Sequence, residues 1–265
     1  MSSVLKTAPS ALSGALRLGQ IISWGTLGLG FFLVALFLTL PAAQVAGWLK
    51  LPLAQVQGSV WQGSLQLRLP QVQLENVSWR VGLGAPWATP LVADVRVQDD
   101  GLEAQSQVGL SWNGAIILRD THADMRLNHP ALAQRLPVPL EGTMRFSLAS
   151  AQWSQGLRQA EAVQLNVDGL RLMMGEPLVL GSFSAQGEVR DGQLKAGLRD
   201  TAAALALQGE AQGDAASGVS LKARASAKPD APAALRDTLS LLPAAPEGGV
   251  LLQTRVPAPW LAKAQ

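Results

Sequence analysis

Residues 219–228 read VSLKARASAK, and this stretch decides the fold class. Its valine, leucine and alanine residues alternate with serine, lysine and arginine, so that every second side chain is apolar. Because successive side chains of a β-strand point to opposite faces, this pattern places one face in a core and the other in water. The stretch therefore predicts a half-buried strand.

The same alternation recurs at 65–69, 77–81 and 163–167, whereas helical periodicity is scarce. Asp-Gly dipeptides at 100–101 and 191–192 are typical of tight hairpins, because both residues tolerate positive φ. The chain is therefore predicted to be mainly β, with a mostly antiparallel sheet. Its apolar faces are rich in alanine and glycine, and such small side chains cannot fill the gap of about 10 Å between stacked sheets. We expect an elongated, twisted, partly open sheet.

Two short helices are predicted, at 130–136 (PALAQRL) and at 232–242 (PAALRDTLSLL), each opened by proline. The sequence LPVPLEG at 136–142 follows the first helix, and LPAAPEG at 242–248 follows the second. An alternating strand is expected after each. We interpret this similarity as a degenerate internal duplication.

The N-terminal region has a different character. Residues 21–40 (IISWGTLGLGFFLVALFLTL) are apolar for about 20 positions, the length that crosses a bilayer. This predicts a transmembrane anchor at 18–49, after a cytoplasmic tail at 1–17. A cleaved signal peptide is the alternative, with an imperfect cleavage site at 41–43, but its apolar core is expected to be shorter.

Lys6 and Arg17 precede the span without any acidic residue, and basic flanks stay in the cytoplasm. The rest of the chain is therefore expected outside the cytoplasm, as a first β half at 50–150 and a second at 151–265. Of the 21 basic residues, 19 follow the span, against 19 acidic residues. This neutral region has no basic face for phosphates, so nucleic acid is excluded as a partner.

The residues that carry enzyme chemistry are largely missing. Cysteine is absent, only two histidines are present, and no nucleotide-binding, serine-hydrolase or zinc-protease motif occurs. His122 could pair with Asp120 or Asp124 on one strand face, but a solvated outer face explains these three side chains better. His129 precedes Pro130 and is expected in a turn or at a helix start. We predict no enzyme, cofactor, metal or small-molecule substrate.

Two groups of residues are candidates for interaction. Trp79 lies between Val77 and Val81 at period two and is expected in the core, whereas Trp61 and Trp87 lie beside glycine or proline and could belong to an interface. Small residues also share one face of the predicted span, along which another membrane helix could pack: Gly19, Ser23, Thr26 and Gly30.

The sequence LAQVQGSVWQGS at 53–64 resembles the type II secretion system protein N family, also called general secretion pathway protein N. The similarity lies in Gly58, Trp61 and Gly63, in the strand VSWRV at 77–81 and in LPVPLEG at 136–142. Chain length and the order of anchor and β region also fit. The C-terminal residues 248–265 are less similar.

The resemblance implies a single-pass component of a Gram-negative inner membrane, with a cytoplasmic N-terminus and a periplasmic C-terminal domain. It would be a non-catalytic accessory of the machine that exports folded periplasmic proteins across the outer membrane. Its partners would be the membrane and other inner-membrane components of that system. The alternative is a periplasmic lipid-handling protein, similar in layout to AsmA-like proteins, whose open sheet holds acyl chains in an apolar groove.

Overall fold

The computed structural model describes residues 39–48, 53–69, 72–133, 138–174, 176–229, 231–240 and 249–261. These residues form thirteen strands and three short helices. In chain order they are α2 (Ala42–Trp48), β1 (Leu53–Gly58), β2 (Gln62–Leu69), β3 (Val72–Leu83), β4 (Leu91–Asp99), β5 (Leu102–Leu110), β6 (Ile116–Arg126), α3 (Pro130–Ala133), β7 (Leu140–Trp153), β8 (Leu157–Met174), β9 (Glu176–Arg190), β10 (Gln193–Ala203), β11 (Leu205–Asp214), β12 (Gly218–Ala227), α4 (Ala233–Ser240) and β13 (Val250–Val256).

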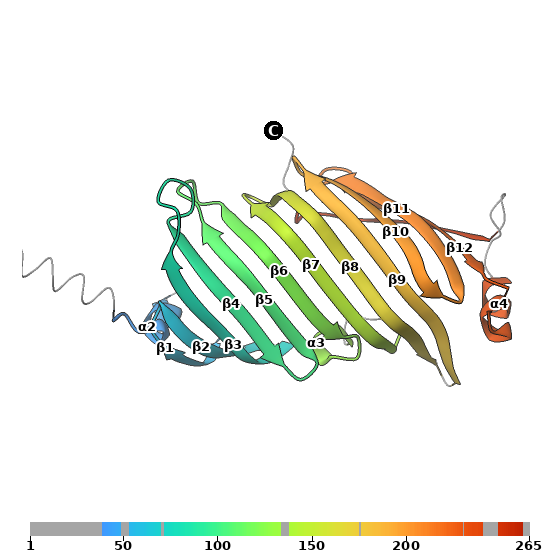
Figure 1. Cartoon of the computed structure of the whole chain (residues 1–265), viewed down its shortest axis with the longest axis horizontal. Coiled ribbons are helices and arrows are strands. Elements are labelled where there is room, and N and C mark those ends of the chain that lie inside the picture. The colour runs from blue at the N-terminus through green and yellow to red at the C-terminus, as the bar shows by residue number, and fades with distance from the viewer. Residues whose placement is uncertain are drawn as a thin grey trace, which may run out of the picture.

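All thirteen strands belong to one sheet in which each strand pairs with its sequence neighbour. Every one of these pairs is antiparallel, as the alternation and the Asp-Gly dipeptides predict. Figure 1 shows a single twisted layer, with β1 to β3 turning behind it at one end and α4 at the other. The prediction of a mainly β, antiparallel, open sheet is therefore confirmed. Residue 150 lies inside β7, and the two halves and their duplication stay predictions.

The strand at 219–228 is β12, and its alternation matches the two faces of the sheet. Leu221, Ala223 and Ala225 lie on the inner face, where the last two are buried, while Lys222 and Arg224 are exposed on the outer face. Residues that pair across neighbouring strands share a face, so apolar and polar side chains are sorted in the same way through the sheet. One face is therefore apolar and the other polar.

The inner face is covered only in part. Its tightest cluster consists of Leu148, Ala151, Ala160 and Val189 from β7, β8 and β9, packed against Ala258 and Leu261 of the C-terminal segment. Elsewhere most inner-face side chains are half-buried, as in β4 and β10. Among the described residues there is no second sheet that could cover them.

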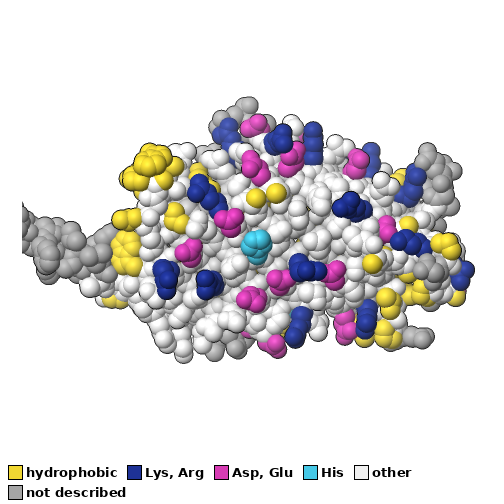
Figure 2. All heavy atoms as spheres, in the orientation of Figure 1, with side chains coloured by type: hydrophobic (Ala, Val, Ile, Leu, Met, Phe, Trp, Pro, Cys, Tyr) yellow, Lys and Arg dark blue, Asp and Glu magenta, His cyan; other side chains and the backbone are white. Residues whose placement is uncertain are grey.

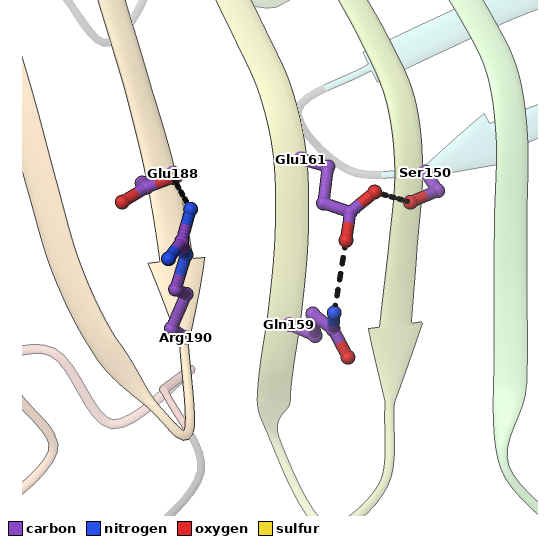
Figure 3. Close-up of polar contacts among 5 residues, drawn as sticks. All are labelled: Ser150, Gln159, Glu161, Glu188 and Arg190. Carbon is purple, nitrogen blue, oxygen red and sulfur yellow. Dashed lines mark hydrogen bonds and ion pairs between the residues drawn. The ribbon is translucent and has the colours of Figure 1, made fainter.

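The outer face carries charged side chains of both signs, spread over its whole visible area (Figure 2). Some of them pair along or across strands. Glu161 on β8 accepts hydrogen bonds from Ser150 Oγ (3.3 Å) and Gln159 Nε2 (3.0 Å), and Arg190 Nη2 lies 2.8 Å from Glu188 Oε2 on β9 (Figure 3). Exposed pairs of this kind contribute about 0–1 kcal/mol each. They keep this face soluble without defining a site.

Two predicted helices are present. The first, α3, spans Pro130–Ala133, and its predicted continuation at 134–137 lies outside the described residues. The second, α4, spans Ala233–Ser240, and Pro232 precedes it, with its carbonyl accepting from the amide of Leu235 at 3.1 Å. The third helix, α2, lies within 18–49, which the sequence predicts as one anchor without a separate helix.

The predicted cytoplasmic tail and nearly all of the predicted span at 21–40 lie outside the described residues. Within the part that is described, none of the helices has the length and apolarity needed to cross a membrane. The anchor and its orientation therefore stay predictions.

Candidate interaction surfaces

The family-like motif around Trp61 folds into one compact unit. Gly58 ends β1 with φ +92°, a conformation that favours glycine, and the turn leads through Trp61 into Gly63 on β2. The ring of Trp79 on β3 lies over Gly63, where an added Cβ would come within 2.5 Å of Trp79 Cζ2. Gly63 therefore leaves the space that the indole of Trp79 occupies.

Hydrogen bonds tie this unit together. The indole N–H of Trp79 donates to the carbonyl of Val60 at 3.0 Å, and the amide of Val81 donates to the carbonyl of Trp61. Trp61 and Trp79 are both half-buried. The motif is thus a packed strand connection, and Trp79 lies at its centre rather than at an ordinary core position.

Trp87 lies in the connection between β3 and β4 with 85% of its surface exposed. A second tryptophan, Trp112 in the connection between β5 and β6, is 73% exposed and was not singled out from the sequence. Its indole N–H donates to the carbonyl of Pro86 at 2.6 Å, and Ser111 Oγ donates to the carbonyl of Ala88 at 3.1 Å. The two connections are therefore joined, and together they present two indoles to the surroundings.

The small-residue face predicted for membrane-helix packing, formed by Gly19, Ser23, Thr26 and Gly30, lies outside the described residues. It stays a prediction.

The histidines do not form a site in this part of the chain. His122 and Asp124 are exposed on the outer face, while Asp120 has φ +47° at an irregularity in the pairing of β6 with β5. His129 is buried before α3, with Nε2 3.5 Å from Asp99 Oδ2. Among the described residues, no group of three or more His, Cys, Asp or Glu side chains could hold a metal ion.

Glycine also shapes the outer face. Near β9 to β12 lies a shallow hollow of about 610 Å³, where Gly197 provides no side chain between Gln186 and Glu210. Its rim carries Arg199 and Lys222 as well as Glu210. Arg224 lies there too, so the lining has three basic residues and one acidic residue. The depression is open and shallow, and the charges alone do not define a class of ligand.

One charged pair lies on the apolar inner face. Lys228 Nζ is 2.6 Å from Asp200 Oδ2, and the amide of Leu207 donates to Asp200 Oδ1 at 3.0 Å. The hydrogen bond from Lys228 holds the pKa of the Asp200 carboxyl below its ordinary value, with help from the amide of Leu207 and against the effect of burial. This pair pins β10 to β11 and to the end of β12.

Comparison with known families gives one result. The family model described as type II secretion system (T2SS), protein N, matches residues 49–253. This range includes all thirteen strands except the last three residues of β13. No curated protein and no solved structure shows a significant match to the chain.

Proposed function

Because the chain belongs to the type II secretion system protein N family, we propose that it is a non-catalytic accessory of that secretion system. In this proposal the chain is anchored in the inner membrane by residues 18–49, with a cytoplasmic N-terminus and a periplasmic sheet. It supports the export of folded periplasmic proteins across the outer membrane. The observation that carries the proposal is the family match over 49–253.

The fold supports a role in assembly. β13 pairs with β12 alone among the described residues, and six of its seven residues are exposed. Its large apolar side chains are exposed as well, including Leu252 at 43% and Val256 at 54%. An edge strand of this kind can pair with an extended segment of another protein through main-chain hydrogen bonds. We therefore propose β13 as a contact with another inner-membrane component.

Export is the direct test. Deletion of the gene should leave a type II substrate in the periplasm, and the full-length chain supplied in trans should return it to the medium. The deletion could also stop export by lowering the synthesis of the other components of the machine. The levels of those components are therefore measured beside export. Normal export by the deletion strain would contradict the proposal.

The anchor has its own test. Alkaline phosphatase fused after Gln265 should be active, and the mature protein should keep its original N-terminus. An inactive fusion would contradict the periplasmic location, and an N-terminal sequence that begins near Gln44 would show that the anchor is cleaved.

The second candidate, a lipid-handling protein, is favoured by the inner face of the sheet. This face is apolar across β4 to β12 and half-buried in most positions, and no second sheet covers it in the part of the chain that the structure describes. An acyl chain would bury apolar surface there at a gain of about 25 cal/mol per Å². Mass spectrometry of lipid that stays with the purified full-length protein would favour this candidate.

A further inference from the structure

Antiparallel pairing brings five tryptophans to one end of the sheet. The connections β1–β2, β3–β4 and β5–β6 carry Trp61, Trp87 and Trp112 at this end. Trp153 ends β7 at the same end, and the C-terminal segment returns there, since the amide of Leu157 donates to the carbonyl of Trp260 at 2.7 Å. Trp153 and Trp260 are 42% and 40% exposed. We call these connections, with the C-terminal segment 256–261, the tryptophan end.

The tryptophan end contains no ionisable side chain in its connecting segments. Neither Asp, Glu, Lys nor Arg occurs at 58–62, 83–93, 109–118, 146–157 or 256–261. Further large apolar side chains are exposed there, among them Leu83 at 86% and Ile116 at 42%. In Figure 2 hydrophobic side chains gather at one corner of the molecule, where Figure 1 shows the connection between β3 and β4, and charged side chains lie along the upper margin beyond that corner.

The opposite end of the same strands has a different composition. β4 ends at Asp99, the connection to β5 carries Asp100, and the end of β6 carries Arg126, which lies 3.7 Å from Asp100. Beyond β8 the tryptophan side of the sheet is charged as well, since the connection between β9 and β10 carries Asp191, whose Oδ1 lies 4.0 Å from Arg158 Nε. The contrast in charge between the two ends is therefore confined to β1 to β8.

The chain also enters the sheet at the tryptophan end. The amide of Val60, in the connection β1–β2, donates to the carbonyl of Leu40 at 3.1 Å, and Pro41 pairs with Ser59. Leu40 is the last residue of the apolar run predicted to span the membrane. On the proposed anchored topology, the bilayer therefore lies next to this end.

We propose that the tryptophan end rests in the headgroup region of the bilayer that holds the anchor, so that β1 to β8 meet the membrane with their uncharged connections and hold Asp100 and Arg126 away from it. The inference rests on the anchor of the proposed function. Indole prefers this region, because its ring can be buried while its N–H stays hydrogen-bonded, as that of Trp112 already is to Pro86. Uncharged connections avoid the cost of bringing ionised groups toward hydrocarbon.

The dimensions suit a membrane contact. From β1 to β8 the strands are separated by seven spacings of about 4.8 Å, which gives a contact line of about 34 Å along the curved sheet. Asp100 follows the nine residues of β4, so it lies about 30 Å along the strand from this line, at roughly 3.3 Å per residue. That distance keeps the charged end out of the headgroup layer.

The test uses the full-length chain, which has no cysteine, so that a single introduced thiol can be labelled with a fluorophore. Three variants are compared: Ala88→Cys at the tryptophan end, Asp100→Cys at the charged end, and Val34→Cys inside the predicted span. Ala88 is exposed, and the side chain of Asp100 is 98% exposed. Each labelled protein is reconstituted alone into phosphatidylethanolamine and phosphatidylglycerol vesicles that contain a lipid with a nitroxide quencher near the headgroup.

We expect loss of fluorescence at positions 34 and 88 and none at position 100. Quenching at 34 without quenching at 88 would overturn the inference while leaving the anchor intact. Absence of quenching at 34 would overturn the anchor and the inference with it. If position 88 becomes protected only when other secretion components are added, the tryptophan end is a protein contact and the membrane inference is wrong. None of these results depends on whether the chain supports secretion.

A second variant tests the indoles themselves. Trp87→Ala combined with Trp112→Ala should reduce the quenching at position 88, because the two most exposed indoles are gone. Leu251→Ala is the matched control, since Leu251 is 51% exposed but lies on β13 away from these connections. The control should leave quenching unchanged. Equal quenching in the double variant and the control would show that the tryptophans do not hold this end at the bilayer.

Discussion

Replacing Gly63 by alanine tests the packed unit around Trp61 and Trp79. The added Cβ would lie 2.4 Å from the carbonyl oxygen of Gln57 and 2.5 Å from Trp79 Cζ2, distances that real Cβ atoms do not adopt. The first contact is backbone, so relief requires a shift of β1 relative to β2. Overpacking of this kind costs about 1–3 kcal/mol.

The control is Gly82→Ala, in which the new Cβ meets nothing within 4 Å. Alanine at such a position changes stability little or raises it by about 0.4–1 kcal/mol, because the unfolded chain loses freedom. For a domain of this size, 1 kcal/mol shifts the melting temperature by roughly 2–4 °C. Gly63→Ala should therefore melt about 2–12 °C below the wild type.

The measurement is thermal unfolding of the purified full-length protein in detergent, followed by tryptophan fluorescence. The emission should change in the folded state of Gly63→Ala, because the ring of Trp79 is displaced. If Gly63→Ala and Gly82→Ala melt together, the close approach of Trp79 to β2 does not exist and the motif needs another explanation.

Three further predictions concern single side chains. Trp61→Ala should lower the free energy of unfolding, measured with denaturant, by about 2 kcal/mol, roughly half the value for a fully buried tryptophan, because Trp61 is half-buried. An unchanged denaturation midpoint together with lost export would place Trp61 on a docking surface instead. His122→Ala and Asp124→Ala should change stability by no more than about 0.5 kcal/mol and leave export intact, since both side chains are exposed on the outer face; lost export at normal protein level would reveal a site. Asp200→Asn should lower the melting temperature at pH 7, where the ionised carboxylate binds Lys228. This deficit should shrink as the pH falls from about 4, the ordinary pKa of the unfolded chain, through the lowered pKa of Asp200 in the folded protein, because the carboxyl contributes stability only while it is ionised. A deficit of equal size at pH 3 and pH 7 would contradict that role.

Local pattern predicted much of the fold. Alternation at 219–228, 163–167 and 77–81 identifies parts of β12, β8 and β3, because period two reports directly on the two faces of a strand. The Asp-Gly dipeptides at 100–101 and 191–192 do form the turns that were expected, with φ +79° at Gly101 and +76° at Gly192. Since the strands pair in chain order, a strand that is identified from its local sequence lies beside the strands that precede and follow it in the chain.

The tryptophan end could not be predicted in the same way. Trp87, Trp112, Trp153 and Trp260 are far apart in the sequence and come together only through the direction of each strand and the return of the C-terminal segment. The contact of Trp79 with Gly63 was missed because Trp79 has the spacing of an ordinary core residue. The four uncharged connections up to β8 alternate along the chain with the connections at the other end, and a search for that alternation could have found the tryptophan end.

The most direct measurement tests the proposal that the chain acts in the cell by contact with other proteins of the secretion system. A photo-reactive amino acid at Thr254, exposed on β13, should cross-link to another inner-membrane component of the secretion system. The same probe at Gln105, exposed on β5 within the sheet, is the control and should give no such product. Cross-links from Thr254 to phospholipid alone, with none to protein, would contradict the assembly role and favour the lipid-handling alternative.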